Sequence, residues 1–309
     1  MKVSALRTEA LSKGDTGIHN CQFSVCHMFL PDRASLFIFW SFAMPVMIQK
    51  RGTLEYLTAE GIAVPHGFTT RLGGVSQEPL DSMNLAVRLE EREENVAENY
   101  RILGEAMGFD PQNLVLTRQT HTDLVRVVTA EDRLGCFHRA YPECDGLVTN
   151  VPGLALVVFT ADCTPILLHD PVTGAVGAVH AGWRGTAKEI AARAVEAMVS
   201  AFGTKPCDIR AAIGPNIGPC CFETDADVPQ SMLAAFGKEA EPWIRSQGDK
   251  YYVNLKELNA LSLRRSGVAH VEISPLCTAC RQDLFWSHRR VGNQRGSQGA
   301  VIVCKGVDR

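Results

Sequence analysis

Three residues of types that bind soft metal ions stand at or beside the ends of predicted strands. His121 follows the apparent strand LVLTRQ, Cys163 follows the strand GLALVVFTAD, and His180 ends the strand GAVGAVH. The ends of neighbouring strands can meet in space, and two imidazoles with one thiolate around zinc leave a fourth position open, which is typical of catalytic zinc sites. The three residues therefore form a candidate metal site. Each of them, taken alone, is also compatible with a core histidine or an inert buried thiol.

The segment AGWRG after the third of these strands predicts a glycine turn that leads into a helix. Thr186 and Glu189 have the spacing of a capping box, which predicts that the helix begins at Thr186. The free N–H groups at such a helix start attract anions, and Arg184 adds a forked cation that suits phosphate or carboxylate. The alternative is a packing turn, in which Gly182 and Gly185 permit close approach and Arg184 is solvated.

Two carboxylates lie next to the candidate metal ligands. Asp162 precedes Cys163, and Asp123 lies two places after His121. Either carboxylate has the chemistry to carry a proton in a metal-assisted reaction, and either is equally typical of a turn residue that caps local backbone. A different chemistry is also open, because Cys163 as nucleophile with His180 as base fits a hydrolase, such as an amidase that acts on a cell-wall precursor.

Eleven cysteines are spread along the chain, and their odd number cannot close completely into intramolecular disulfides. This usage predicts a reducing, cytoplasmic compartment in which most thiols are small buried hydrophobes. Cys277 and Cys280 form a Cys-x-x-Cys pair, but no second pair of that spacing completes a four-thiolate site, so reduced thiols are favoured there. Cys220 and Cys221 follow the run IGPNIGP and are interpreted as packing residues of a rigid loop.

The overall composition excludes several classes of protein. The chain has 309 residues, of which 46% are hydrophobic and 21% charged, and this fits a globular protein with a sizeable core. Its net charge of -3 provides no basic field for a nucleic-acid backbone, so nucleic acid is not the expected partner. The expected partner is a small molecule.

The first 49 residues differ from the rest of the chain. Their one apolar run, LFIFWSFAMPVMI, has about 13 residues, is interrupted by Pro45, and is shorter than the roughly 20 residues that a membrane-spanning helix needs. We therefore expect a poorly structured leader over 1–49 and no membrane anchor. We favour the interpretation that this leader is an upstream extension and that the coding region itself starts at Met44 or Met47. A targeting segment is the less favoured alternative. Residues 50–309 are expected to form one domain.

The domain reads as a mixed α/β fold. Apolar runs bounded by turn residues predict strands at LVLTRQ, LVRVVTA, GLALVVFTAD, PILLHD, GAVGAVHAG, DIRAAIGP and GAVIVCK. Amphipathic stretches predict helices at EREENVAENYRILGEAMG, GTAKEIAARAVEAMVSAFG and LKELNALSLRRSG. Two pairs of strands follow one another through the tight turns TADCTP and HDPVTGA, which favours mixed rather than wholly parallel sheets.

Several motifs in a fixed order resemble one family of proteins. The string TADCTPILLHDPVTGAVGAVHAGWRGTAKEI resembles the core of the YfiH-like, laccase-domain family, once labelled multicopper polyphenol oxidase, which includes human FAMIN. The further motifs in family order are PHGFTTRLGGVS, MNLA, LTRQTH, DGLVT, IGPNIGPCCFE and FWSHRR. The resemblance extends from about residue 53 to the end of the chain. One departure is Ser297-Gln298, where the family usually has Gly-Arg, and Arg295 is the nearest substitute.

This resemblance implies a single-domain, four-layer α/β/β/α fold with mixed sheets and a metal held by His121, Cys163 and His180. It also implies a purine nucleoside phosphorylase, which cleaves adenosine, inosine, guanosine or methylthioadenosine with phosphate, together with some adenosine deaminase activity. Zinc is the expected ion and copper a competitor in vitro. Phosphorolysis needs contacts for an oxyanion, and Arg184 and Arg71 have side chains suited to that role.

The older laccase label can be tested on the histidines. A four-copper laccase cluster uses about ten histidines, several of them in His-x-His pairs, whereas this chain has nine and none in such a pair. A true multicopper oxidase is therefore excluded. A copper-dependent polyphenol oxidase side activity at the three-ligand site stays open, as does a catalytically weak scaffold that binds partner enzymes.

Overall fold

The first of two large sheets contains both ends of the domain. The computed structural model describes residues 46–307 apart from 88, 90, 134 and 138–141, so most of the predicted leader lies outside the described residues. The spatial order of the first sheet is β1 (Met47–Arg51), β2 (Leu54–Thr58), β3 (His66–Thr69), β15 (Gln298–Val303), β7 (Ala155–Thr160) and β4 (Leu114–Leu116). Strand β1 pairs with β2, and the sheet therefore begins slightly before the predicted boundary at residue 50.

The second sheet also has six strands and holds the centre of the chain. Its spatial order is β14 (His270–Ile273), β10 (Arg210–Ile213), β8 (Thr164–His169), β9 (Val176–Ala181), β6 (Gly146–Thr149) and β5 (Val125–Val127). Both sheets are mixed, as predicted, because each contains parallel and antiparallel pairs. A small third sheet contains β11 (Glu223–Thr224), β13 (Lys250–Val253) and β12 (Ile244–Gln247).

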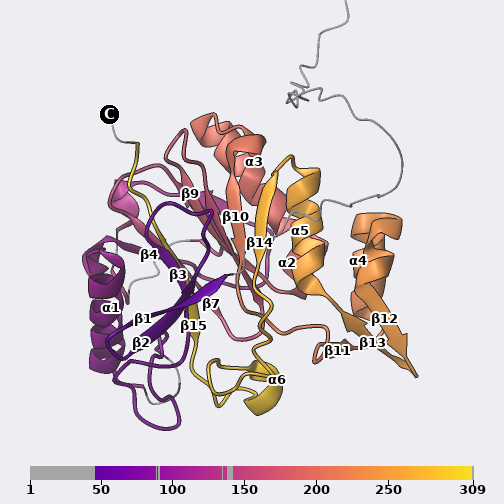
Figure 1. Ribbon diagram of the computed structural model, residues 1–309, viewed down its shortest axis with the longest axis horizontal. Coiled ribbons are helices and arrows are strands. Elements are labelled where there is room, and N and C mark those ends of the chain that lie inside the picture. The colour runs from indigo at the N-terminus through magenta and orange to yellow at the C-terminus, as the bar shows by residue number, and fades with distance from the viewer. Residues whose placement is uncertain (1–45, 88, 90, 134, 138–141, 308–309) are drawn as a thin grey trace, which may run out of the picture. The chain divides into compact units, whose positions relative to one another are not determined.

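Helices cover the outer faces of the two large sheets, which gives the expected four layers (Figure 1). Helix α1 (Glu93–Met107) packs on the first sheet, and α3 (Ile190–Phe202) and α5 (Leu255–Arg265) pack on the second. The other helices are α2 (Trp183–Ala187), α4 (Asp227–Phe236) and α6 (His288–Val291), with 3₁₀ turns at Pro111–Asn113, Ala130–Asp132, Pro206–Asp208 and Gly237–Trp243. None of the described helices is both long and apolar enough to cross a membrane.

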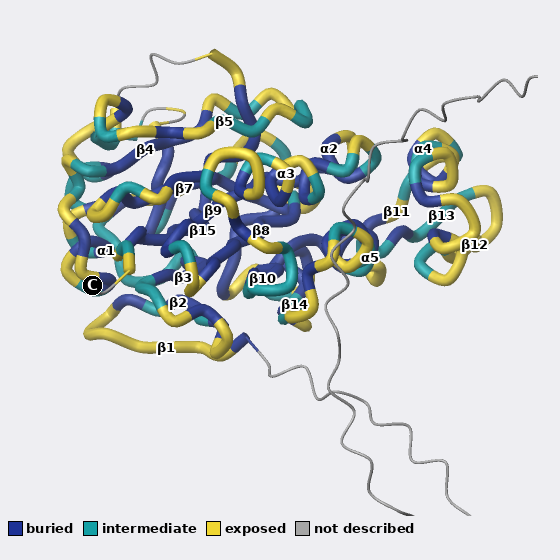
Figure 2. Tube along the Cα trace, turned by 90° about the horizontal axis from the view of Figure 1, so that it is seen from above, coloured by how far each residue is buried: buried dark blue, intermediate teal, exposed yellow. Residues whose placement is uncertain are grey.

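The main core lies between the two large sheets. Side chains from both sheets meet there, among them Leu156 and Val158 of β7 with Leu167 of β8 and Ala178 of β9, all fully buried. Figure 2 shows this buried interior in dark blue, with α4, β12 and β13, whose residues range from buried to exposed, at one end of the molecule. Strands buried on both faces need continuous apolar runs, which is why β7, β8 and β9 were recognisable in the sequence.

The two tight turns of the sequence have different outcomes. The turn HDPVTGA joins β8 and β9 as antiparallel neighbours in one sheet, which confirms that pair. The turn TADCTP does not join neighbours, because β7 belongs to the first sheet and β8 to the second. Asp162 takes a φ of 91° at this crossover, a conformation that is uncommon for residues other than glycine. Cys163 therefore lies where the chain passes from one sheet to the other.

The predicted capping box does not form. Helix α2 begins at Trp183 after Gly182, and Glu189 takes a left-handed conformation with a φ of 55° that separates α2 from α3. The Thr186 hydroxyl instead accepts a hydrogen bond of 2.9 Å from the Asn259 amide on α5. A tertiary contact has thus replaced the local cap, and one predicted helix has become two.

Candidate active site

The structure brings His121, Cys163 and His180 together from three separate elements. His121 lies in the loop after β4, Cys163 in the crossover between the sheets, and His180 near the end of β9. Their ligand atoms all lie within 4.8 Å of one another, and His121 Nε2 is 3.8 Å from Cys163 Sγ. The two imidazole rings meet edge to face, with centroids 5.1 Å apart. This is the convergence that the strand ends predicted.

A buried carboxylate that the sequence analysis did not single out orients this cluster. Asp145 Oδ2 lies 2.7 Å from His180 Nδ1, so a proton on Nδ1 leaves Nε2 free to act as a ligand. The same carboxylate accepts hydrogen bonds from the backbone N–H groups of His121 and Thr122, and from the Thr122 hydroxyl. One side chain therefore positions both histidines. The only signal in the sequence was the motif DGLVT, whose Asp145 carried no assigned role.

The electrostatics of the cluster favour a thiolate. Burial opposes charge on Cys163, but His180 and His121 outweigh it and lower the pKa of the thiol to about 6. Burial likewise opposes charge on His180, yet the Cys163 thiolate and the Asp145 carboxylate raise the pKa of the imidazole to about 9. The pKa of Asp145 falls to about 2, because its bonds to His180 and Thr122 outweigh the effect of burial. Without a metal, the cluster is a thiolate and imidazolium pair at neutral pH.

Gly182 has no room for a side chain beside the cluster. A Cβ atom built there would lie 2.7 Å from His121 Cδ2 and 3.3 Å from Cys163 Sγ. Gly185 has more space, since its nearest neighbour would be the Thr122 carbonyl oxygen at 3.2 Å. The glycines of AGWRG thus allow close approach, as the packing interpretation of that turn expected.

Two cavities meet at the cluster. They have volumes of about 220 and 370 Å³ and share His121, Ala161, Cys163 and Arg295. The smaller cavity has polar walls that include Thr117, Gln119 and Ser297. The larger one is bounded by Trp183, Ile217, Phe222, Leu255, His288, Arg289 and Asn293. A polar and a more apolar chamber joined at a metal-ligand cluster suit a substrate with one polar and one aromatic part.

The two arginines that the sequence put forward do not line these cavities. Arg71 stacks on Trp286 at 3.9 Å, donates to the Asp81 carboxylate at 3.0 Å, and borders a different cavity. Arg184 is exposed and stacks on its neighbour Trp183 at 4.2 Å. Arg184 nevertheless lies beside the larger cavity, because Trp183 lines it. The contacts of both arginines with an oxyanion stay predictions.

The two candidate proton carriers are engaged in structural contacts. Asp162 is buried, and its carboxylate accepts hydrogen bonds from the Thr278 hydroxyl, the Ser287 hydroxyl and the Arg289 backbone N–H at 2.6–3.0 Å. Asp123 forms an ion pair with Lys188 at 3.3 Å. Asp162 therefore has the geometry of the capping alternative, although it also lines the larger cavity, whereas Asp123 pairs with a side chain and not with local backbone.

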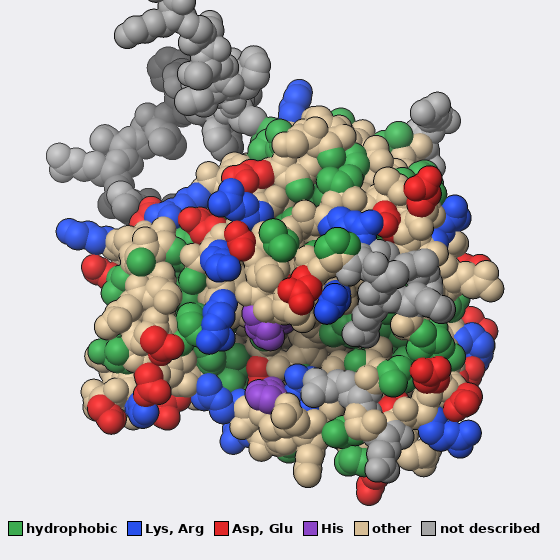
Figure 3. Space-filling model, turned by 180° about the vertical axis from the view of Figure 1, so that it is seen from behind, with side chains coloured by type: hydrophobic (Ala, Val, Ile, Leu, Met, Phe, Trp, Pro, Cys, Tyr) green, Lys and Arg blue, Asp and Glu red, His purple; other side chains and the backbone are tan. Residues whose placement is uncertain are grey.

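Ser297-Gln298 stands where the family usually has Gly-Arg, and a nearby arginine, Arg295, lies at the cluster. Arg295 borders both cavities, and its Nε lies 3.4 Å from His288 Nδ1. Gln298 is buried and exchanges two hydrogen bonds with the backbone of Trp286. Arg295 therefore reaches both cavities, and its substitution for the family's arginine stays a prediction. In the view from behind, histidine side chains lie at a hollow in the surface beside Lys and Arg side chains (Figure 3).

Comparisons with known proteins extend over most of the chain. A family model described as multi-copper polyphenol oxidoreductase laccase matches residues 65–305. Purine nucleoside phosphorylase YlmD of Bacillus subtilis is 36% identical over 84% of this chain and 94% of its own length. Human purine nucleoside phosphorylase LACC1 is 32% identical over 82% of this chain and 59% of its own length. The crystal structure of YlmD from Geobacillus stearothermophilus aligns with a TM-score of 0.79 at 35% identity, covering 84% of this chain and 100% of that one.

Proposed function

This chain belongs to the multi-copper polyphenol oxidoreductase laccase family, and on that premise we propose that it is a metal-dependent purine nucleoside phosphorylase. The proposed reaction cleaves adenosine, inosine, guanosine or methylthioadenosine with phosphate to give the free base and the sugar 1-phosphate. The observation that carries the proposal is the junction of two cavities at His121 and Cys163, since phosphorolysis must hold a nucleoside and an oxyanion side by side.

The donor atoms at this junction fit a zinc ion. His121, Cys163 and His180 would hold it through two imidazole nitrogens and one thiolate, with Asp145 behind His180 as the orienting carboxylate. A bound zinc would act as a Lewis acid toward an oxygen of the substrate or of phosphate. Copper would fit the same donors, and an oxidase side activity with added copper would then not imply a native oxidase role.

The larger cavity is proposed to bind the purine. Phe222 and Trp183 offer aromatic faces there, and Leu255 and Ile217 exclude water. A flat, polarisable base binds well against such surfaces. The smaller cavity would then take the ribose, whose hydroxyl groups match polar walls such as Gln119.

Phosphate is proposed to bind near Arg295, between the two cavities. Its guanidinium would supply forked hydrogen bonds to the anion, and His288 lies beside it. This position would place a phosphate oxygen next to the sugar while the base lies in the larger cavity. Arg295 also stabilises developing negative charge more effectively in a partly enclosed site than in open water.

A product assay tests the function directly. The purified full chain is incubated with each of four nucleosides, with and without inorganic phosphate, and bases and sugar phosphates are separated by chromatography. We expect release of free base that depends on phosphate and equals the sugar 1-phosphate formed. Release of free base at the same rate with and without phosphate would contradict phosphorolysis. Conversion of adenosine to inosine would show the deaminase activity instead.

One observation favours a second candidate function, a cysteine hydrolase. Cys163, His180 and Asp145 stand in the order of nucleophile, base and orienting carboxylate. If an alkylating reagent modified Cys163 in the protein as purified and abolished amide hydrolysis, this function would replace the phosphorylase. Protection of the same thiol by zinc would favour the metal site.

Metal affinity is expected to depend steeply on pH. Between about pH 6 and 9 the metal-free cluster holds one proton on His180 while Cys163 is a thiolate, so binding must displace that proton. The association constant should therefore fall about tenfold per pH unit over this range as pH decreases, and more steeply below about pH 6, where Cys163 is protonated too. Competition with a chromophoric chelator at each pH measures this association constant. A flat profile from pH 9 to 7 would show that His180 is not a ligand.

A further inference from the structure

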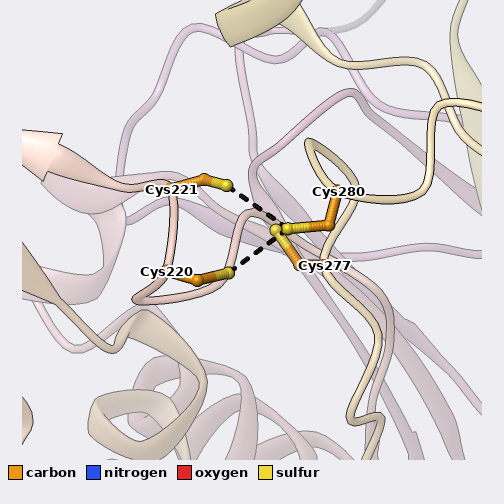
Figure 4. Close-up of side chains that lie close together, drawn as sticks. All are labelled: Cys220, Cys221, Cys277 and Cys280. Carbon is orange, nitrogen blue, oxygen red and sulfur yellow. Dashed lines mark hydrogen bonds between the residues drawn. The ribbon is translucent and has the colours of Figure 1, made fainter.

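Four cysteines gather outside the candidate active site. Cys220 and Cys221 come from the loop after β10, and Cys277 and Cys280 come from the loop after β14, with their sulfur atoms turned toward one another (Figure 4). All four Sγ atoms lie within 4.8 Å of one another. Cys280 Sγ is 3.5 Å from that of Cys220 and 3.4 Å from that of Cys221.

The sheet explains how residues so far apart in sequence meet. Strands β10 and β14 are parallel neighbours, so the loops that follow them leave the same edge. A parallel bridge between Asn216 and Cys277 continues this pairing, and the Thr278 N–H donates to the Asn216 carbonyl at 3.0 Å. The Cys-x-x-Cys pair, for which the sequence offers no second pair of the same spacing, therefore has two further thiols beside it, and all four are free thiols as expected. Its second pair is the adjacent dipeptide Cys220-Cys221, a spacing that sequence motifs do not include.

The arrangement suits one tetrahedral ion better than a disulfide. Four thiolates around zinc at about 2.3 Å lie about 3.8 Å from one another, close to the separations found here. Cys280 is almost equally distant from two partners, so no single disulfide pair is singled out. The Gly218 backbone N–H donates to Cys277 Sγ at 3.1 Å, a bond that favours the thiolate form of a ligand.

Neighbouring groups hold the two loops in place. The buried Lys256 ammonium donates to the carbonyl oxygens of Ser274 and Leu276, directly before Cys277. Arg290 Nη2 lies 3.9 Å from Cys221 Sγ and adds a positive charge beside the sulfurs. Positive groups around a set of thiolates offset the net negative charge that four of them give to a divalent ion.

We propose that Cys220, Cys221, Cys277 and Cys280 bind one structural zinc ion that fastens these two loops together. All four ligands come from the protein, so the site is closed and structural rather than catalytic. Its effect reaches the larger cavity, because Phe222 follows Cys221 and lines that cavity, and Arg289 donates to the Cys221 carbonyl at 3.0 Å. The proposal does not depend on the phosphorylase function.

Zinc content of the full chain tests the proposal. In the Cys163→Ala variant, which lacks a thiolate of the other cluster, we expect one tightly held zinc per chain by elemental analysis. Adding Cys280→Ser, at an exposed ligand, should remove that zinc. The matched control is Cys207→Ser, a thiol outside both clusters, which should leave the zinc content unchanged. A Cys163→Ala protein without zinc, or one whose zinc survives Cys280→Ser, would overturn the proposal.

Cobalt binding provides a second readout, which does not require the variant with Cys280→Ser to fold. Cobalt loaded into the Cys163→Ala chain should give strong thiolate-to-cobalt charge-transfer absorption and the intense visible bands of tetrahedral coordination. Strong chelators should lower the melting temperature of the Cys163→Ala chain, and zinc should restore it. Weak octahedral cobalt bands, or a Cys280 disulfide in protein purified under reducing conditions, would contradict a four-thiolate site.

Discussion

Cys163→Ala is expected to lower kcat/KM for the proposed phosphorolysis by about 10³-fold and to remove the zinc that we propose to bind at the junction of the two cavities. The substitution leaves only two imidazoles to hold the ion, and zinc with two protein ligands is not retained against a chelator. The lost electrostatic stabilisation of developing charge is of the size seen when one preorganised group is deleted from an active site. Initial rates with saturating phosphate, together with elemental analysis, measure both effects.

The control for this variant is Cys207→Ala, which changes a thiol outside both cysteine clusters. Its rates and zinc content should match the wild type. Because Cys163 is only partly buried, the alanine variant should unfold at nearly the wild-type temperature, so that a loss of activity reports on the site. Retention of more than a tenth of the wild-type rate in Cys163→Ala would contradict the proposed role of the thiolate.

Asp145→Asn should weaken zinc binding about 10- to 100-fold, although Asp145 touches neither the ion nor either cavity. An amide cannot hold the His180 Nδ1 proton as firmly as a carboxylate, and one amide orientation presents an N–H group to another N–H group. The backbone donors of His121 and Thr122 also lose a charged acceptor. Because the Asp145 side chain is fully buried, we expect a loss of about 3 kcal/mol in the free energy of unfolding.

The pH dependence of zinc affinity distinguishes a role of Asp145 in positioning His180 from a general loss of stability. Without the carboxylate, the pKa of the His180 imidazole should fall below its wild-type value of about 9, so the proton that competes with zinc is lost more easily. The tenfold loss of zinc affinity per pH unit should then begin at a lower pH in Asp145→Asn. Asp123→Asn is the matched control, since Asp123 pairs with the exposed Lys188. An unchanged onset would assign Asp145 a purely structural role.

The local pattern of the sequence was sufficient for the buried strands and for singling out the three residues of the histidine and cysteine cluster. Strands β7, β8 and β9 are apolar along their whole length because both faces are covered, and such runs are visible without any structure. His180 lies near the end of β9, and His121 and Cys163 lie in the loops that follow β4 and β7, so these segments bring the three side chains together. The order of the motifs was sufficient to assign the family and, with it, the four layers.

Other features depended on contacts between residues far apart in the chain. The capping box failed because Thr186 bonds to Asn259, and the TADCTP turn joins two sheets because no local rule decides which sheet a strand enters. Arg71 lies outside the cavities while Arg295 borders both, and nothing in the composition of either segment distinguishes them. The three-dimensional position and orientation of each side chain decide whether it reaches the cavities.

The cysteines show the same division. Their number and spread predicted thiols rather than disulfides, and one thiol beside two histidines was correctly singled out for its position in the cluster. The sequence could not show that Cys220-Cys221 faces Cys277 and Cys280, because that meeting follows from the parallel pairing of β10 with β14. The sequence by itself determined which side chains can bind a metal or react, from their residue types and their positions near strand ends. The order of strands in the sheets determined which of these side chains meet, because strand pairing is set by the packing of the whole core.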